Sequence, residues 1–179
     1  GGAAWNEWRK ATDRASAESF GDSLVAAMES GDPAVQRQEL ATITAEGDRA
    51  GILNLLLAAT ELRAEDRPAA VAALLAVENN ADLPTSYRQI AALKRVIIGG
   101  ADIPLDERQG VLAGLAAPGQ AFRPLALEQL ALCRQSGDRA GALAQAQALL
   151  QEPDVTAGLR RRVAQLIVTL GGEQPGDLG

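Results

Sequence analysis

Few side chains in this sequence have the chemistry of a catalytic or metal-binding residue. The chain has no His, so the commonest general base and the commonest metal ligand are both missing. Cys133 is the single Cys, and without a His to activate its thiol we expect it to be a small, buried apolar residue. Glu61, Glu65 and Asp66 lie close together, but acids that end one helix and cap the next are common. We therefore predict that the protein is not an enzyme and has no cofactor and no metal site.

The remaining polar motifs suggest binding at most. Gly99 and Gly100 lack the Lys and Ser or Thr of a phosphate-binding loop, so they indicate the end of a helix. Three consecutive arginines, 160–162, spread over about 200° of a helix surface, so at least one must face away from the core. They form either a solvated surface or a site for an acidic lipid or an acidic partner protein. The candidate partner-binding residues are Tyr87, Arg88, Arg95, Arg160, Arg161 and Arg162.

The only two Trp residues lie near the start of the chain and favour a membrane boundary. Trp5 and Trp8 are three residues apart, which places them on one face of a helix. They follow small residues and precede basic ones, an order typical of a chain that leaves a membrane. The candidate membrane-interface residues are Trp5, Trp8, Arg9 and Lys10, and we expect both rings to be exposed in the isolated chain. The alternative is that the Trp pair packs on the core.

The overall composition predicts an all-α protein. Of 179 residues, 47% are hydrophobic but only 3% are aromatic. Ala and Leu, which favour helices, far outnumber the β-branched Val and Ile, which favour strands. The net charge of −6 argues against a nucleic-acid partner. Because no run of about 18 apolar residues is present, membrane attachment would require a segment outside this chain.

Pro, Gly and Asp divide the sequence into about eight or nine helices joined by short turns. A long Ala-rich helix ends at Gly31, and Asp32 and Pro33 start the next one. The most apolar helix, 48–64, is expected at the centre of the core. The predicted helices cover residues 4–30, 34–46, 48–64, 66–80, 84–100, 105–116, 122–135, 139–151 and 153–170.

An internal repeat indicates how these helices pair. The pentapeptide Gly-Asp-Arg-Ala-Gly occurs at 47–51 and again at 137–141. A looser copy aligns Asp66 with Asp138 and Ala70 with Ala142. This spacing resembles the second helix of a tetratricopeptide repeat, in which a small Ala lets two helices of a hairpin approach closely. We expect both alanines at helix–helix contacts, in a right-handed array of antiparallel hairpins with degenerate repeats and a long N-terminal helix.

The opening sequence Gly-Gly-Ala-Ala-Trp-Asn-Glu-Trp-Arg-Lys, the long Ala-rich helix, the Gly-Asp-Pro turn and the degenerate hairpins resemble one bacterial family. This is the family of membrane-anchored, tetratricopeptide-like ancillary subunits of the SecYEG translocon. The resemblance implies a transmembrane helix before residue 1, a periplasmic helical domain, and contacts with the translocon or with periplasmic chaperones. It implies no catalytic residues.

These observations predict a non-catalytic protein–protein interaction module on a single-pass protein of the bacterial inner membrane. Residues 1–30 are expected to form a juxtamembrane stalk helix, 31–172 the tetratricopeptide-like domain, and 173–179 a flexible tail. The alternative is a soluble cytoplasmic adaptor or regulatory domain. The identity of the partner and the oligomeric state do not follow from the sequence.

Overall fold

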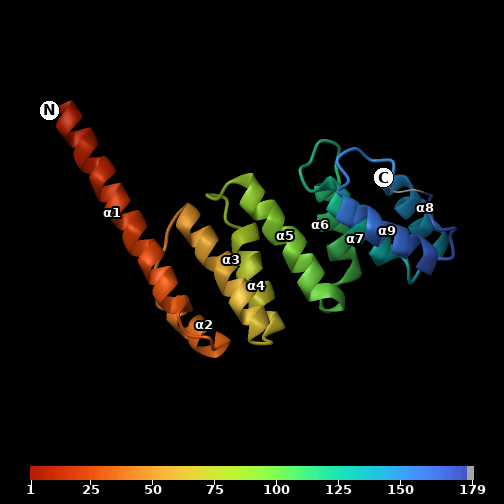
Figure 1. Ribbon diagram of the computed structural model, residues 1–179, viewed down its shortest axis with the longest axis horizontal. Helices are drawn as coiled ribbons and strands as arrows, with labels where there is room; N and C mark the ends of the chain where they lie inside the picture. The colour runs from red at the N-terminus through yellow and green to blue at the C-terminus, as the bar shows by residue number, and fades with distance from the viewer. Residues whose placement is uncertain (177–179) are drawn as a thin grey trace. The chain divides into compact units, whose positions relative to one another are not determined.

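The computed structural model describes residues 1–176, and all regular secondary structure within them is helical. Within them are nine α-helices, one 3₁₀ turn and no strand, which confirms the all-α prediction (Figure 1). Residues 177–179 of the predicted tail lie outside the described residues. The helices are α1 (Gly2–Met28), α2 (Pro33–Ala41), α3 (Asp48–Arg63), α4 (Arg67–Glu78), α5 (Thr85–Gly99), α6 (Leu105–Leu115), α7 (Arg123–Arg134), α8 (Arg139–Leu149) and α9 (Ala157–Thr169), with the 3₁₀ turn at Gly100–Asp102.

The chain forms two compact units, Gly1–Arg88 and Gln89–Gly179. The boundary falls within α5, so unit 1 contains α1–α4 with the start of α5, and unit 2 contains the remaining helices. This boundary lies inside the region 31–172 that the sequence assigns to one domain. The division into a stalk, a repeat domain and a tail stays a prediction.

Helix α1 is long, but only its last third packs against other residues. Residues 1–19 are all exposed, whereas Phe20 is partly buried and Ala27 is buried. Gln36 of α2 fixes the packed end, because its side-chain amide donates to the carbonyl oxygen of Met28 at 3.3 Å. The same side chain accepts a hydrogen bond from Arg63 of α3 at 2.7 Å. One buried amide therefore joins the first three helices.

Helix α2 begins as predicted and ends earlier than predicted. It starts at Pro33, with the Asp32 carboxylate as its cap. It ends at Ala41, so the prediction of a helix to residue 46 is wrong. Residues 42–44 are all β-branched, which lowers helix propensity, and the Thr42 hydroxyl donates to the carbonyl oxygen of Glu39 at 2.7 Å. Residues 43–46 consequently have no regular secondary structure.

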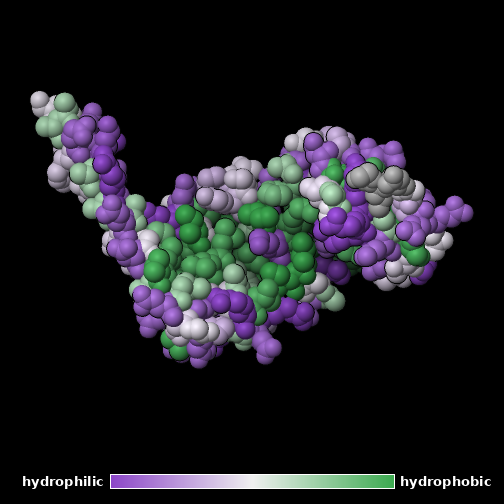
Figure 2. All heavy atoms as spheres, viewed as in Figure 1, coloured by the Kyte–Doolittle hydropathy of each residue, from purple (hydrophilic) through white to green (hydrophobic). Residues whose placement is uncertain are grey.

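Helices α3 and α4 pack against each other in unit 1, and α4 has more buried residues than any of α1, α2 and α3. The buried residues of α4 are Ala70, Ala73, Leu74 and Val77, whereas those of α3 are only Gly51, Ala58 and Thr60. Ile52 and Leu62 of α3 are 40% and 43% exposed. The expectation that α3 lies at the centre of the core is therefore wrong. Its apolar residues surround the helix, so one side faces solvent, and Figure 2 shows hydrophobic residues gathered where Figure 1 draws α3.

Unit 2 has two apolar clusters that are joined through α7. The first lies between α5, α6 and α7 and is centred on Leu93, Val96, Leu112 and Ala126. The second lies between α8 and α9 and is centred on Ala146, Leu149, Leu159, Val163 and Ile167. Leu125 and Leu127 of α7 pack against both clusters. Helix α7 therefore makes one continuous core of unit 2.

The alignment of α4 with α8 agrees with the local structure. Asp66 accepts a hydrogen bond from the backbone N–H three residues later at 3.0 Å, and Asp138 does the same at 2.8 Å. Ala70 and Ala142 are both 0% exposed, which confirms that they lie at packed positions. The repeated pentapeptide does not start both of its helices alike, because Asp48 is the first residue of α3 and makes no cap.

Helix α9 begins later than predicted. Its cap is Thr156, whose hydroxyl accepts a hydrogen bond from the Leu159 N–H at 3.2 Å. The sequence predicts a cap at Pro153 and Asp154, which is wrong. Asp154 instead has a φ of +64°, a left-handed conformation that turns the chain before the helix starts.

Candidate functional site

A groove of about 800 Å³ runs between α1 and the irregular segment 42–46 in unit 1. We call it the α1 groove. The residues that α1 contributes follow at intervals of three, one, three, three and one, so they form one face of the helix. The lining consists of Ser16, Ser19, Phe20, Ser23, Ala26, Ala27, Glu39, Thr42, Ile43, Thr44, Ala45, Glu46 and Arg49.

The α1 wall of this groove is rich in hydroxyl groups. The Ser23 hydroxyl donates to the carbonyl oxygen of Ser19 at 2.9 Å, and the Ser16 hydroxyl accepts from Arg49 at 2.7 Å. Phe20 is the large apolar residue of this wall, and the Arg49 guanidinium lies 5.9 Å from its ring centre. The wall therefore combines one aromatic surface with oxygen atoms that retain unused lone pairs.

The opposite wall has unpaired backbone groups. The backbone N–H groups of Thr44, Ala45 and Glu46 donate no hydrogen bond to any described residue. Backbone amides at a surface bond to water or to a bound partner. An extended peptide placed along this segment would accept such bonds with its carbonyl oxygens, as in the addition of a strand to a sheet edge.

The groove has more negative than positive charge. Glu39 and Glu46 line it, and neither carboxylate makes an ion pair with a described residue. The basic residue of the lining, Arg49, donates to Ser16 and covers Phe20. Two uncompensated carboxylates would attract a basic side chain of a bound segment.

The predicted membrane-interface residues lie at the exposed start of α1. Trp5 and Trp8 are each 58% exposed, which confirms that neither packs on the core. Their rings stack, with centroids 5.1 Å apart. Arg9 is exposed, and the Lys10 ammonium lies 3.7 Å from the carboxylate of Glu7. Stacked indoles beside basic residues suit a membrane surface, and that role stays a prediction.

The predicted partner-binding residues of α5 differ in exposure. Tyr87 and Arg88 are partly buried, and the Arg88 guanidinium donates to the carbonyl oxygen of Glu78 at 3.1 Å. Arg95 is only 4% exposed and donates to the Glu107 carboxylate at 2.9 Å. Its burial leaves little of the side chain for a partner to contact, so Arg95 serves to join α5 to α6.

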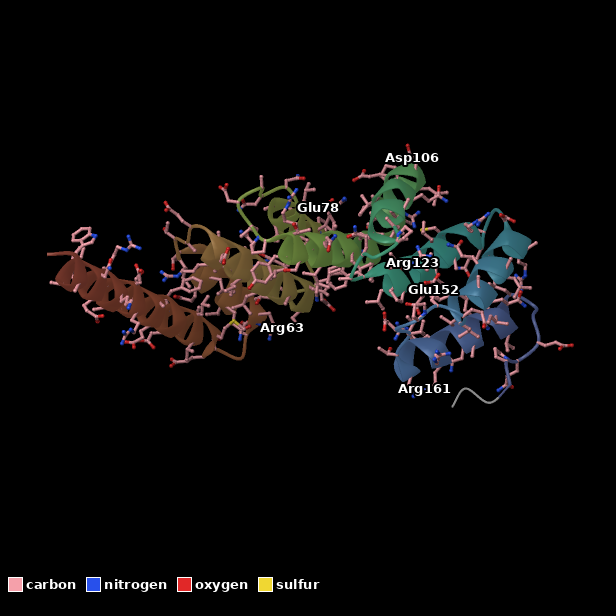
Figure 3. The ribbon with its side chains drawn as sticks, turned by 90° about the horizontal axis from the view of Figure 1, so that it is seen from above. Arg63, Glu78, Asp106, Arg123, Glu152 and Arg161 are labelled. Carbon is pink, nitrogen blue, oxygen red and sulfur yellow. The ribbon has the colours of Figure 1, made fainter. Side chains whose placement is uncertain are left out.

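The three consecutive arginines of α9 have three different environments. Arg160 donates to the carbonyl oxygen of Leu150 at 3.2 Å, and Arg162 makes two hydrogen bonds to Glu128, at 2.9 and 3.0 Å. The hydrogen bond to Glu128 raises the pKa of Arg162. Arg161 is exposed at the outer side of α9 (Figure 3) and lines a hollow of about 510 Å³ with Val168. Of the three, Arg161 is the one that makes no hydrogen bond or ion pair with a described residue.

A further ion pair fixes the turn before α9. Arg123 at the start of α7 and Glu152 point toward one another (Figure 3), with nitrogen and oxygen atoms 2.7 Å apart. The hydrogen bond between them lowers the pKa of Glu152 and raises the pKa of Arg123. These charges are compensated within unit 2, so this pair positions helices.

The residues that first suggested chemistry have structural roles. Cys133 is partly buried against the α5–α7 cluster. Glu61 and Asp66 both pair with Arg37 of α2, at 3.1 and 3.4 Å. Glu65 adopts a left-handed φ of +63° in the turn between α3 and α4. In residues 1–176 no three His, Cys, Asp or Glu side chains are grouped closely enough to hold a metal ion.

The α1 groove is not among the sites predicted from the sequence. One signal for it was present: the β-branched run 42–44 predicts a break in the helix, and a break exposes backbone groups. No pattern in the sequence predicts that the carboxylates of Glu39 and Glu46 lack ion-pair partners, because this depends on which arginines lie nearby in space.

The comparisons with other proteins give no family. No protein-family model matches the chain, and neither curated proteins nor solved structures include a significant match. Among the described residues, no helix combines the length and the apolar character that crossing a membrane requires.

Proposed function

We propose that this chain is a non-catalytic protein–protein interaction module that holds an extended, basic segment of a partner protein in the α1 groove. The observation that supports this most directly is the combination in one groove of unpaired backbone N–H groups with the two uncompensated carboxylates of Glu39 and Glu46. Backbone bonds would supply affinity without strict sequence specificity, and the carboxylates would select positive charge.

We also propose that the helices form degenerate tetratricopeptide-like hairpins in a right-handed array. The equivalent caps of Asp66 and Asp138 and the buried Ala70 and Ala142 support this pairing. Arrays of helix hairpins are common scaffolds for binding extended segments of other proteins.

The placement of the module rests on the start of α1 and on the family resemblance. We propose that the chain is the periplasmic domain of a single-pass inner-membrane protein that assists the Sec translocon or periplasmic chaperones. The exposed, stacked Trp5 and Trp8 with their basic neighbours support a membrane surface at that end. A reporter fusion that located this domain in the cytoplasm would favour an adaptor role instead.

Site-specific photo-crosslinking tests the groove and its partner together. A photoreactive phenylalanine derivative replaces Thr44, which lines the groove, or Val35, which is 39% exposed on α2 outside the groove. Each variant is irradiated with purified SecYEG in lipid nanodiscs and, in parallel, with purified periplasmic chaperones.

We expect crosslinks from position 44 and none from position 35. Glu46→Lys in the position-44 variant should reduce the yield severalfold, because it reverses one of the two charges that attract the partner. Equal yields from both positions would contradict the groove as the binding site. Crosslinks at neither position would exclude the translocon and the chaperones as partners.

A further inference from the structure

The solvent side of α3 has an apolar stripe whose members are exposed or only partly buried. Its members follow at intervals of three, one, three and three residues, which places them on one side of a helix. Ile52 at one end is 40% exposed and Leu62 at the other is 43% exposed. We call this stripe the α3 face, and it consists of Ile52, Leu55, Leu56, Ala59 and Leu62.

The other sides of α3 are already used, so this stripe is not a gap in the core. Gly51 and Ala58 are buried on one side, where an added side-chain carbon at Gly51 would lie 3.0 Å from Leu83. Thr60 is fully buried on another side, where Arg63 donates to its hydroxyl at 3.3 Å. An apolar stripe that remains exposed beside two packed sides is typical of an interaction surface.

The α3 face has opposite charges at its two ends. Asp48 begins the helix and is exposed, and its carboxylate makes no ion pair with a described residue. Arg63 ends the helix and is exposed, and its side chain donates to the neutral Gln36 and Thr60. Each end therefore has a charge that lacks a charged partner.

We propose that the occupant of the α3 face is the α3 face of a second copy of this chain, related by a two-fold axis. When two copies of a helix pack antiparallel with the axis near Leu55 and Leu56, the start of one helix lies beside the end of the other. Asp48 of each copy then comes within reach of Arg63 of the other copy. The interface is thus its own complement in charge, as a two-fold interface must be.

The sizes of the side chains agree with this arrangement. Antiparallel packing places the large Ile52 against the end that contains the small Ala59, so a protruding side chain meets a shallow position. A parallel arrangement would instead bring the two Asp48 residues together at one end and the two Arg63 residues together at the other. Both contacts are between like charges and are repulsive. The paired residues Asp48 and Arg63, and Ile52 and Ala59, do not line the α1 groove, so this inference is independent of the proposed peptide binding.

One helix face buries little surface, so we expect a weak dimer. Interfaces below about 1,200 Å² in total usually belong to transient complexes, and a dissociation constant on the order of 10–100 μM is reasonable. Sedimentation equilibrium of the full chain over a wide concentration range should therefore give a mass that rises from 18.6 kDa towards twice that value.

Two matched substitutions test whether the α3 face forms the contact. Ile52→Asp places a charge within the proposed interface, against the Ala59 end of the other copy, and should raise the dissociation constant at least roughly tenfold. Leu75→Asp makes a comparable change on α4, where the side chain is also 40% exposed but lies outside the α3 face. It should leave the dimer unchanged, and circular dichroism should show both variants folded.

A charge-swap experiment tests the antiparallel arrangement. Asp48→Arg alone and Arg63→Asp alone should each be monomeric, because each variant places like charges at both ends of the interface. A mixture of the two variants should form a heterodimer, since both contacts are then attractive, and this dimer should weaken as salt is added.

Three results would overturn the proposal. The first is a mass of the native chain that stays at 18.6 kDa at every concentration up to about 1 mM, well above the expected dissociation constant. The second is an equal effect of Ile52→Asp and Leu75→Asp on association. The third is a mixture of the charge-swap variants that remains monomeric while the native chain dimerises, which would exclude the antiparallel contact.

Discussion

Replacing Ala142 by Phe tests whether α8 packs as closely as the repeat alignment requires. Ala142 is 0% exposed, so the added phenyl ring has no open space and must displace neighbouring helices or side chains. Overpacking of this kind costs about 1–3 kcal/mol of unfolding free energy. With a urea dependence of about 2 kcal/mol per molar for a unit of this size, the unfolding midpoint should fall by roughly 0.5–1.5 M.

Ala144 on the same helix is exposed and provides the matched control. Ala144→Phe adds the same ring at the surface and should change the midpoint by less than about 0.3 M, which corresponds to about 0.5 kcal/mol. Circular dichroism follows the helices directly, which is necessary because both Trp residues lie in α1, far along the chain from this site. Equal midpoints for the two variants would refute the close contact at Ala142 and, with it, the alignment of α4 with α8.

Two further predictions concern the start of α1 and the cap of α8. Replacing Trp5 and Trp8 together by Ala should leave the thermal midpoint nearly unchanged, within about 0.5 kcal/mol, because both rings are largely exposed; a fall of several degrees would show that they pack on the fold. The hydrogen bond from the Gly141 N–H, aided by Arg134, lowers the pKa of Asp138 in the folded chain. The ionised carboxylate therefore stabilises the fold at pH values above its unfolded-state pKa. This stabilisation is lost as the pH falls through the folded-state pKa. Asp138→Asn should therefore lower the thermal midpoint at pH 7 and lower it less at pH 3, and a difference that is the same at both pH values would contradict this role.

Most helix boundaries followed from local signals in the sequence. The Asp-Pro pair at 32–33 and the acids at 66 and 138 predicted three helix starts, because a side-chain cap acts within its own turn. Such signals depend only on neighbouring residues. Errors occurred where two local signals competed, as at 42–44, where the apolar spacing suggested a helix and β-branching opposed it.

The exposure of α3 could not be predicted by the same reasoning. Periodicity identifies the buried side of a helix by its contrast with a polar side, and α3 has apolar residues on almost every side. Its seven-residue stretch 52–58 contains only one polar residue, Asn54, so no direction was favoured. The buried positions include the small Gly51 and Ala58, and at Gly51 an added side-chain carbon would lie 3.0 Å from Leu83, a neighbour distant in the sequence.

The candidate groove could not be predicted from the sequence, for a related reason. Its two walls come from α1 and from the segment after α2, and the Gln36 amide helps to hold the end of α1 against α2. A single buried amide has no periodic signature. The exposure of Trp5 and Trp8, by contrast, was predictable, since the residues around them offer nothing large to pack against.

The exposed start of α1 can span two different distances, depending on whether its first turn is attached to another structure. Residues 2–15 rise by about 1.5 Å each, so as a straight helix they place the first turn roughly 20 Å from Ser16, where the α1 groove begins. No tertiary contact supports most of this segment, and helices of such length are only marginally stable in water. If the first turn is held, the segment is a rigid spacer that sets how far from its anchor the groove operates. If it is released, the helix unwinds from that end, and the spacer becomes a flexible tether of greater reach.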